Sequence, residues 1–144
     1  MTGRSIDELS IGDRAELSRK VKASDIATFL GLIGDRNPVH SDPAFMGRTT
    51  FQEPIAPGMW TASLISAVIG THLPGEGCIY ASQELQFLRP VKFGDTITAR
   101  VEVAEIRADR NRVRLKTTCT NQGGELVLAG DAWVLPRKRS AAGP

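Results

Sequence analysis

The sequence predicts an α+β fold in which a long antiparallel sheet wraps around one buried helix. The first observation is an interval without Asp, Glu, Lys or Arg between Glu53 and Glu76, the longest in the 144-residue chain. The second is a series of later stretches in which apolar and polar residues alternate, as they do on the two faces of a strand. With 41% hydrophobic and 24% charged residues, the chain has the composition of a domain that buries a core.

A strand and a helix are expected at the start of the chain. Residues 14–21 can form the strand, and a helix capped by Ser24 should follow it and end near Gly34. Its apolar residues have the spacing of one helical stripe and are Ile26, Phe29, Leu30 and Ile33. This stripe predicts that the helix packs one face against the core.

A loop and a second, short helix are expected next. Pro38 disfavours the helical conformation at the residue before it, so residues 35–40 should form a loop. Asp42 and Pro43 are typical of the cap and first turn of a helix, which should run through Phe45.

The uncharged interval contains the predicted central helix. Its prolines and glycines confine the helical part to residues 58–70, well short of the roughly 20 residues that a bilayer requires. Apolar residues occur on every side of this segment, which predicts that neighbouring elements cover most of the helix.

Four stretches with strand character follow the central helix, and they should form the sheet. Short segments rich in turn residues separate them, which favours antiparallel pairing between consecutive stretches and hence a meander. Their ranges are 78–88, 95–106, 112–121 and 125–135. We expect one domain over residues 1–136 and a basic, flexible C-terminal tail over residues 137–144.

Charge and cysteine content limit the partners and the compartment. The net charge of +2 is too small to favour nucleic acid as a partner. Cys78 and Cys119 lack the spacing of a redox or metal motif and are expected to be inert thiols in a reducing interior. The first twenty residues lack the apolar run of a secretory signal, so we expect a cytoplasmic protein without a membrane partner.

Asp35 and His40 can both transfer protons and lie within six residues on a turn stiffened by proline. A carboxylate and an imidazole that titrates near neutrality could hold and activate a water molecule between them. The alternative is structural, because Asp commonly opens turns and a histidine in a loop is often a surface side chain.

Gly58 opens the predicted central helix directly after Pro57. The free N–H groups at a helix start attract negative charge, and glycine lets a ligand approach the backbone, as an oxyanion hole requires. Without further evidence, ordinary helix initiation is the preferred explanation of these residues. Ser66 is a hydroxyl within this apolar helix, which either contacts substrate or bonds to its own helix.

Three segments stand out as motifs: GDRNPVH at 34–40, DPAF at 42–45 and PIAPGM at 54–59. Together they resemble the hydratase signature of the MaoC-like (R)-specific enoyl-CoA hydratases. Later segments of the family resemble LPGEG at 73–77, LQFLRPV at 85–91 and GD at 94–95, so the resemblance covers nearly the whole chain. It implies a hot-dog fold, in which an antiparallel sheet wraps a long helix, and a homodimer with an acyl-CoA tunnel at the subunit interface.

The resemblance also implies roles for particular residues. Asp35 and His40 would activate water, and the N–H of Gly58 would bind the thioester oxygen. The implied substrate-binding residues are Ser66, Asn37, Met59 and Trp60. The family usually has His before that glycine where this chain has Pro57, so any hydrogen bond from that imidazole is absent.

The implied activity is reversible hydration of trans-2-enoyl-CoA to (R)-3-hydroxyacyl-CoA. A dehydratase acting on carrier-protein thioesters and a non-catalytic acyl-thioester binding module remain alternatives, whereas a thioesterase is disfavoured because the predicted central helix carries no acidic residue. No metal-ligand cluster or nucleotide-binding glycine motif occurs, so neither a metal nor a cofactor is expected. Arg89 and Lys92 could meet the phosphates of CoA or could simply be solvated charges.

Overall fold

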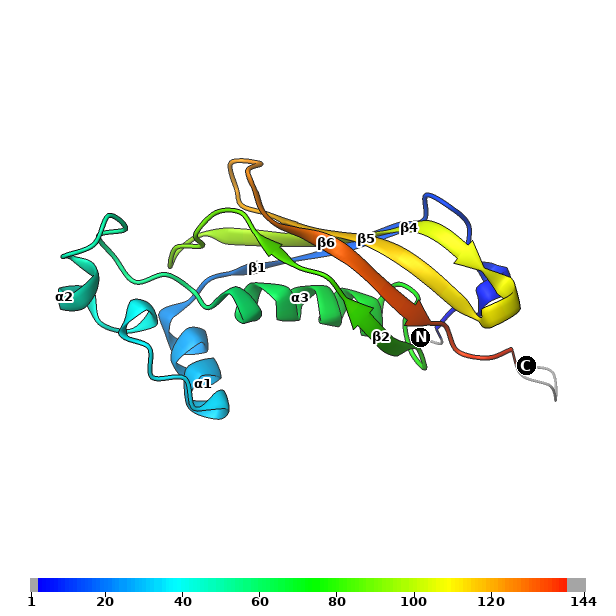
Figure 1. Ribbon diagram of the computed structural model, residues 1–144, viewed down its shortest axis with the longest axis horizontal. Coiled ribbons are helices and arrows are strands. Elements are labelled where there is room, and N and C mark those ends of the chain that lie inside the picture. The colour runs from blue at the N-terminus through cyan, green and yellow to red at the C-terminus, as the bar shows by residue number, and fades with distance from the viewer. Residues whose placement is uncertain (1–2, 140–144) are drawn as a thin grey trace.

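A six-stranded antiparallel sheet packs against one long helix in the computed structural model, which describes residues 3–139 (Figure 1). The sheet has the order β1-β4-β5-β6-β2, and β3 also pairs with β6. The strands are β1 (Arg14–Lys20), β2 (Ile79–Gln83), β3 (Gln86–Phe87), β4 (Thr96–Arg107), β5 (Arg112–Thr120) and β6 (Leu126–Leu135). The predicted α+β architecture, a sheet curved around a helix, is confirmed.

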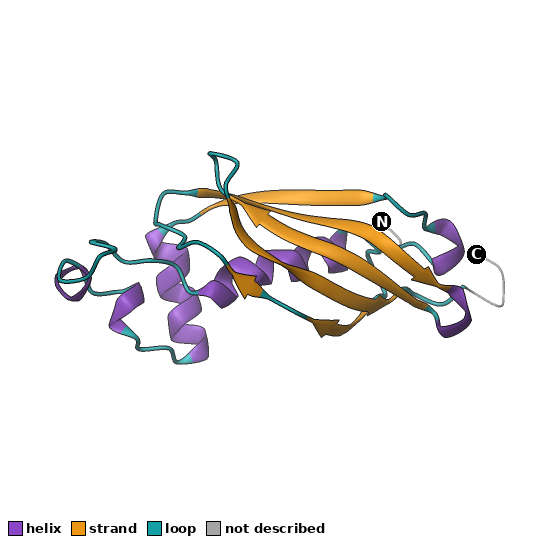
Figure 2. Ribbon diagram, turned by 45° about the horizontal axis from the view of Figure 1, so that its top comes forward, coloured by secondary structure: helices purple, strands orange, loops and turns teal. Residues whose placement is uncertain are grey.

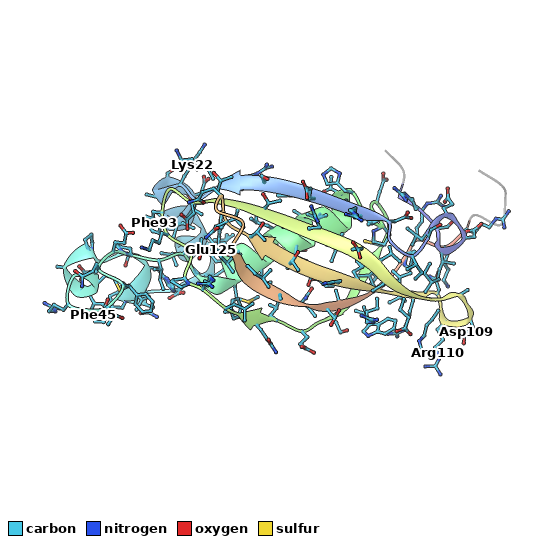
Figure 3. All side chains as sticks on the ribbon, turned by 90° about the horizontal axis from the view of Figure 1, so that it is seen from above. Lys22, Phe45, Phe93, Asp109, Arg110 and Glu125 are labelled. Atoms are coloured by element: carbon cyan, nitrogen blue, oxygen red, sulfur yellow. The ribbon has the colours of Figure 1, made fainter. Side chains whose placement is uncertain are left out.

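Three α-helices and three 3-10 turns complete the fold. The α-helices are α1 (Ala23–Ile33), α2 (Pro43–Met46) and α3 (Gly58–Thr71), and the 3-10 turns are Ile6–Glu8, Pro38–His40 and Ala108–Arg110. Helix α3 runs beneath the strands, whereas α1 and α2 gather at one end of the molecule (Figure 2). Phe45 of α2 therefore lies at the opposite end from Asp109 and Arg110 in the β4–β5 turn (Figure 3).

The helix boundaries agree with the sequence except at one cap. Helix α1 ends at Gly34 in the left-handed conformation, and Asp42 caps α2 by accepting hydrogen bonds from two backbone N–H groups. The predicted cap at Ser24 is wrong, because the N–H of Ile26 already bonds to the carbonyl of Lys22. Lys22 is the N-cap and makes no side-chain cap, so Ser24 lies inside the first turn.

The core forms between α3 and the concave face of the sheet. Alternate residues of β4 and β5 point inward and are fully buried, as their alternation predicted. The residues of α3 that meet them are Trp60, Thr61, Ala62, Leu64, Ile65, Val68 and Ile69. The sheet covers this side of α3, as predicted. The opposite side of the helix carries an exposed stripe with Met59, Ser63 and Ser66.

The predicted meander is correct for β4, β5 and β6 and wrong for the stretch before them. This stretch forms β2 and β3, which pair with β6 rather than β4. The segment between β3 and β4 then leaves β6. The carbonyl of Val91 accepts the N–H of Ala56 (2.8 Å), which ties this segment to the chain before α3. The N–H of Gly94 donates to the carbonyl of Val21 (2.8 Å), directly after β1. Because β1 and β5 occupy the two sides of β4, no edge of β4 is free for β3.

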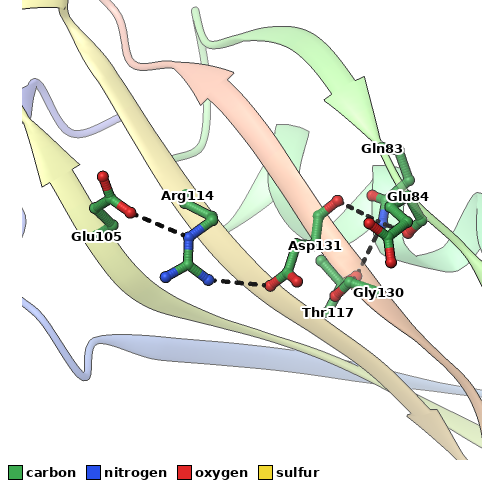
Figure 4. Close-up of polar contacts among 7 residues, drawn as sticks. All are labelled: Gln83, Glu84, Glu105, Arg114, Thr117, Gly130 and Asp131. Atoms are coloured by element: carbon green, nitrogen blue, oxygen red, sulfur yellow. Dashed lines mark hydrogen bonds and ion pairs between the residues drawn. The ribbon is translucent and has the colours of Figure 1, made fainter.

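Polar side chains also link the strands. Arg114 of β5 lies between Glu105 of β4 (3.3 Å) and Asp131 of β6 (3.2 Å), as Figure 4 shows. The amide of Gln83 donates to the hydroxyl of Thr117 at 2.9 Å, and that hydroxyl donates to the carbonyl of Gly130 at 2.8 Å. These contacts tie β2 to β5 and β6.

The chain at Arg137 packs against the N-terminal segment, where the sequence predicted the start of a flexible tail. Arg137 forms a parallel bridge with Ser5, donates to the carbonyl of Gly3 and forms an ion pair with Glu8 at 3.0 Å. The tail boundary expected at residue 137 is therefore too early, because the guanidinium finds acceptors in the N-terminal segment. Residues 140–144 lie outside the described residues, and their flexibility stays a prediction.

Candidate active site

Local hydrogen bonds give the loop between α1 and α2 a defined shape. Gly34 has a φ of 76°, and its N–H and that of Asp35 both bond to the carbonyl of Leu30 (2.9 and 3.0 Å), which ends the helix and turns the chain. The Asp35 carboxylate accepts the N–H of Asn37 at 2.9 Å, and the side chain of Asn37 accepts the N–H of Val39 at 3.1 Å. One oxygen of Asp35 is thus fixed, and the other stays available.

The structure brings Asp35 and His40 together, as the loop motif predicted. The Nε2 atom of His40 lies 3.7 Å from Oδ2 of Asp35. The imidazole is well buried, with 12% of the side chain exposed, whereas the carboxylate keeps 29%. The carboxylate is therefore more accessible to solvent than the imidazole.

The other ring nitrogen of His40 decides which tautomer is present. Nδ1 lies 2.8 Å from the backbone carbonyl oxygen of Ile55. A carbonyl oxygen only accepts, so Nδ1 carries the hydrogen of the neutral ring and Nε2 presents a lone pair toward Asp35. Two acceptors 3.7 Å apart make no direct hydrogen bond, but one water molecule can donate a hydrogen to each.

Gly58 lies at the N-terminus of α3, with Pro57 as the N-cap. The chain before it is held by the hydrogen bond from the N–H of Ala56 to Val91 and by a bridge between Ile55 and Lys92. Ile55 therefore positions both His40 and the start of α3. The first N–H groups of a helix have no acceptor within the helix, so the N–H of Gly58 is available to a ligand.

A cavity of about 450 Å³ lies beside His40 and Gly58, and Asp35 is not among its lining residues. His40 and Gly58 line it together with residues of the β3–β4 connection and the start of β6. Most lining side chains are apolar, and Arg89 contributes a permanent positive charge. Phe87 lies over Gly58 so closely that a Cβ at this glycine would be 2.6 Å from the ring.

The other predicted site residues occupy different places. Ser66 lines a second hollow, of about 740 Å³, on the exposed side of α3 between α1 and β2. Met59 borders both hollows. Asn37 is exposed and stabilises the 3-10 turn, whereas Trp60 is 8% exposed in the core and borders neither hollow. The substrate contacts of these four residues stay predictions.

Two features of the site were not found from the sequence. The carbonyl of Ile55 sets the tautomer of His40, and a backbone atom leaves no signal in the residue type. Thr61 is a buried polar residue among those that line the cavity. Its position three residues after Gly58 was a signal, because such residues are neighbours on one face of a helix.

Neither cysteine lies in an environment that activates its thiol. Burial raises the pKa of the Cys119 thiol to about 12, and burial also raises the pKa of Cys78. Within residues 3–139, no three His, Cys, Asp or Glu side chains lie close enough to hold a metal ion. No helix in the same range combines the length and apolar character needed to span a membrane.

A sheet wrapped around a central helix, with an acid–imidazole pair beside the helix start, defines a hot-dog protein with a candidate active site. The family model described as MaoC like domain matches residues 10–123. The chain is 45% identical over 138 residues to the 3-hydroxybutyryl-CoA dehydratase of Methylorubrum extorquens, covering 96% of this chain and 87% of that protein. The chain belongs to the MaoC-like family.

Solved structures agree with this assignment. The unliganded R-hydratase PhaJ1 from Pseudomonas aeruginosa superposes with a TM-score of 0.89 at 43% identity, covering 94% of this chain and 87% of that one. The (R)-hydratase of Aeromonas caviae gives a TM-score of 0.85 at 45% identity, covering 88% and 96% of the two chains. The hot-dog fold implied by the sequence motifs is confirmed.

Proposed function

We propose that the protein is an (R)-specific enoyl-CoA hydratase that reversibly adds water to trans-2-enoyl-CoA. The observation that carries the proposal is the pair of acceptors 3.7 Å apart, His40 Nε2 and Asp35 Oδ2, in a loop beside a free helix-start N–H. Relatives named (R)-specific enoyl-CoA hydratase and 3-hydroxybutyryl-CoA dehydratase, each 45% identical, support the reaction and its stereochemistry.

We assign each step of hydration to one of these groups. A water molecule donates one hydrogen to His40 Nε2 and the other to Asp35 Oδ2, which points an oxygen lone pair away from the pair and toward C3 of the substrate. As the C3–O bond forms, Nε2 takes one proton and the electrons of the C2–C3 double bond move toward the thioester. The N–H of Gly58 donates to the enolate oxygen that results.

Transfer of the proton from His40 to C2 then completes the addition. The imidazolium is stabilised by the adjacent carboxylate of Asp35 while the proton is held, and the Nδ1–H bond to Ile55 keeps the ring oriented. Dehydration follows the same steps in reverse.

The chemistry at the cavity mouth supports a CoA ester as the substrate. Arg89 lines the cavity and forms an exposed ion pair with Glu125 at 3.4 Å, and Lys92 forms one with Glu53 at 3.6 Å. Exposed pairs of this kind contribute little stability, so a phosphate can replace the carboxylate at low cost. A carrier-protein thioester is the alternative, supported by a 36% identical tomato protein named 3-hydroxyacyl-[acyl-carrier-protein] dehydratase.

We also propose a homodimer that works in the cytoplasm. The hollow with Ser66 joins the exposed stripe of α3 to strand β2, which ends the order of the sheet. Tyr80 and Ile79 of this strand are 38% and 62% exposed, and a second copy would cover them. The two free thiols support a reducing compartment.

The test is turnover of crotonyl-CoA by variants of the pair. Asp35→Asn and His40→Gln should each lower kcat by about 10²- to 10⁴-fold, the usual contribution of a general acid–base group. Asp109→Asn and His72→Gln are matched controls at exposed positions outside the cavity. Saturable binding of substrate by the wild-type protein without turnover would favour the non-catalytic module instead.

A further inference from the structure

An open hollow of about 600 Å³ lies beside the β4–β5 turn. Its lining residues are Arg107, Arg110, Arg112, Trp133 and Ser82. Of these five described residues, three are arginines and none is acidic, a charge pattern that attracts an anion. Arg110 lies at the opposite end of the molecule from Phe45 of α2 (Figure 3). The hollow shares no lining residue with the cavity that contains His40 and Gly58.

The hollow belongs to the outer face of the sheet, away from α3. Val113 and Val134 are fully buried on the concave face. Successive residues of a strand point to opposite faces, so Arg112 and Trp133 point outward. The guanidinium carbon of Arg107 lies 5.9 Å from the centroid of the Trp133 ring. Charged and aromatic side chains of neighbouring strands therefore adjoin each other on this face.

The strand register places two of the arginines directly opposite each other. Arg107 of β4 pairs with Arg112 of β5 at the end of their ladder. Like charges in directly opposite positions of an antiparallel pair repel each other and destabilise the sheet. An anion that meets both guanidinium groups would replace this repulsion with attraction.

The nearby carboxylates leave most of this positive charge without a partner. Glu105 pairs with Arg107 at 2.7 Å and is shared with Arg114 at 3.3 Å. Within residues 3–139, no ion pair includes Arg110 or Arg112. Two guanidinium groups at the hollow are thus available to an anionic ligand.

We propose that this hollow binds a nucleotide, with its phosphates at Arg110 and Arg112 and its base beside Arg107 and Trp133. The planar guanidinium fork matches phosphate oxygens in pairs, and bases stack on guanidinium and aromatic planes. The hydroxyl of Ser82 can donate to a ribose or phosphate oxygen. The volume of the hollow is within the roughly 300–1,000 Å³ of small-molecule sites.

The first test is titration with ATP, followed by tryptophan fluorescence. The chain has two tryptophans, Trp133 in the hollow and the buried Trp60, so saturable quenching should report on Trp133. Arg112→Gln should weaken ATP binding roughly 10- to 100-fold, as expected for lost charge-assisted hydrogen bonds to phosphate. Arg89→Gln is the matched control, because it removes an arginine from the other cavity, and it should leave the ATP affinity unchanged.

Calorimetry with two further ligands separates the base from the phosphates. Trp133→Leu should weaken ATP binding roughly 5- to 100-fold through lost stacking, and it should change the affinity for tripolyphosphate little. Adenosine 3′,5′-bisphosphate is the nucleotide portion of CoA. Tighter binding of this compound than of ATP would identify CoA as the source of the nucleotide, and the reverse would identify a free nucleotide.

Several results would overturn the proposal. One is the absence of binding by both nucleotides, and another is equal ATP affinity in the wild type and Arg112→Gln. Equal affinity of the wild type for ATP and tripolyphosphate, or for ATP and a hexaglutamate peptide, would show a general anion-binding surface instead of a nucleotide site.

Thermal unfolding without ligand supplies an independent readout. Arg112→Gln removes the repulsion with Arg107, so its Tm should be equal to or above that of the wild type. A Tm several degrees lower would show that Arg112 is engaged within the protein, and the proposal would fail.

Discussion

A side chain at residue 58 would collide with an aromatic ring. The Cβ of an alanine there would lie 2.6 Å from Cε1 of Phe87, and Phe87 is 54% exposed and can move toward solvent. The ring and the glycine therefore fit each other, and together they shape the mouth of the cavity next to the N–H that we assign to the thioester oxygen.

We predict that Gly58→Ala destabilises the protein modestly, by about 1 kcal/mol, because the exposed ring of Phe87 can move away from the added methyl group. Phe87→Ala removes the ring, so combining the two substitutions should recover most of the loss in a double-mutant cycle measured by urea unfolding. Additive effects of the two substitutions would contradict the contact.

At the scale of single residues, the sequence identified the candidate residues but not the contacts that orient them. Asp35, His40 and Gly58 were identified from residue type, spacing and family motif, and the structure brings all three to one loop and one helix start. The orientation of His40 depends on a carbonyl fifteen residues away, which only the folded chain brings into contact.

Helix α1 contains Gly31 and is ended by Gly34, and these two glycines differ in backbone conformation. Gly31 lies inside the helix, and a Cβ added to it would have open space within 4 Å, whereas Gly34 ends the helix with a φ of 76°. A methyl group is favourable at the first position and strained at the second.

Gly31→Ala should therefore stabilise the protein by about 0.5–1 kcal/mol, because alanine has the higher helix propensity. Gly34→Ala should destabilise it by about 1–2 kcal/mol, the cost of a left-handed residue with a Cβ. Urea midpoints at equal protein concentration measure both effects, and shifts of the same sign would refute the assignment of the helix end.

Elements were predictable where a local pattern determines them. Helix α3 and strands β4 to β6 follow from an uncharged interval and a period of two, whereas the position of β2 and β3 beside β6 depends on β1 occupying the edge of β4. Local periodicity does not report competition between distant strands for one edge, and the predicted meander was wrong for that reason.

At the scale of the whole molecule, the exposed stripe of α3 and strand β2 form one apolar surface around the hollow with Ser66. Ala81 lines this hollow and is exposed, and Ile11 is an exposed residue, 63% accessible, in the turn before β1.

We predict that the wild type is a dimer in light scattering after size exclusion and that Ala81→Arg is a monomer, because a charge would be buried at the interface. Ile11→Arg should remain a dimer. A monomeric wild type, or a dimeric Ala81→Arg, would argue against this surface as the interface.

The bridge between Ser5 and Arg137 joins the two ends of the described chain at the end of the molecule remote from α1, α2 and the loop with His40 (Figure 1). An affinity tag or surface anchor attached at either side of this junction would leave the cavity mouth facing solution. The same proximity suits circular permutation, since a short peptide could connect the ends while new ones are opened at an exposed turn such as the one between β5 and β6.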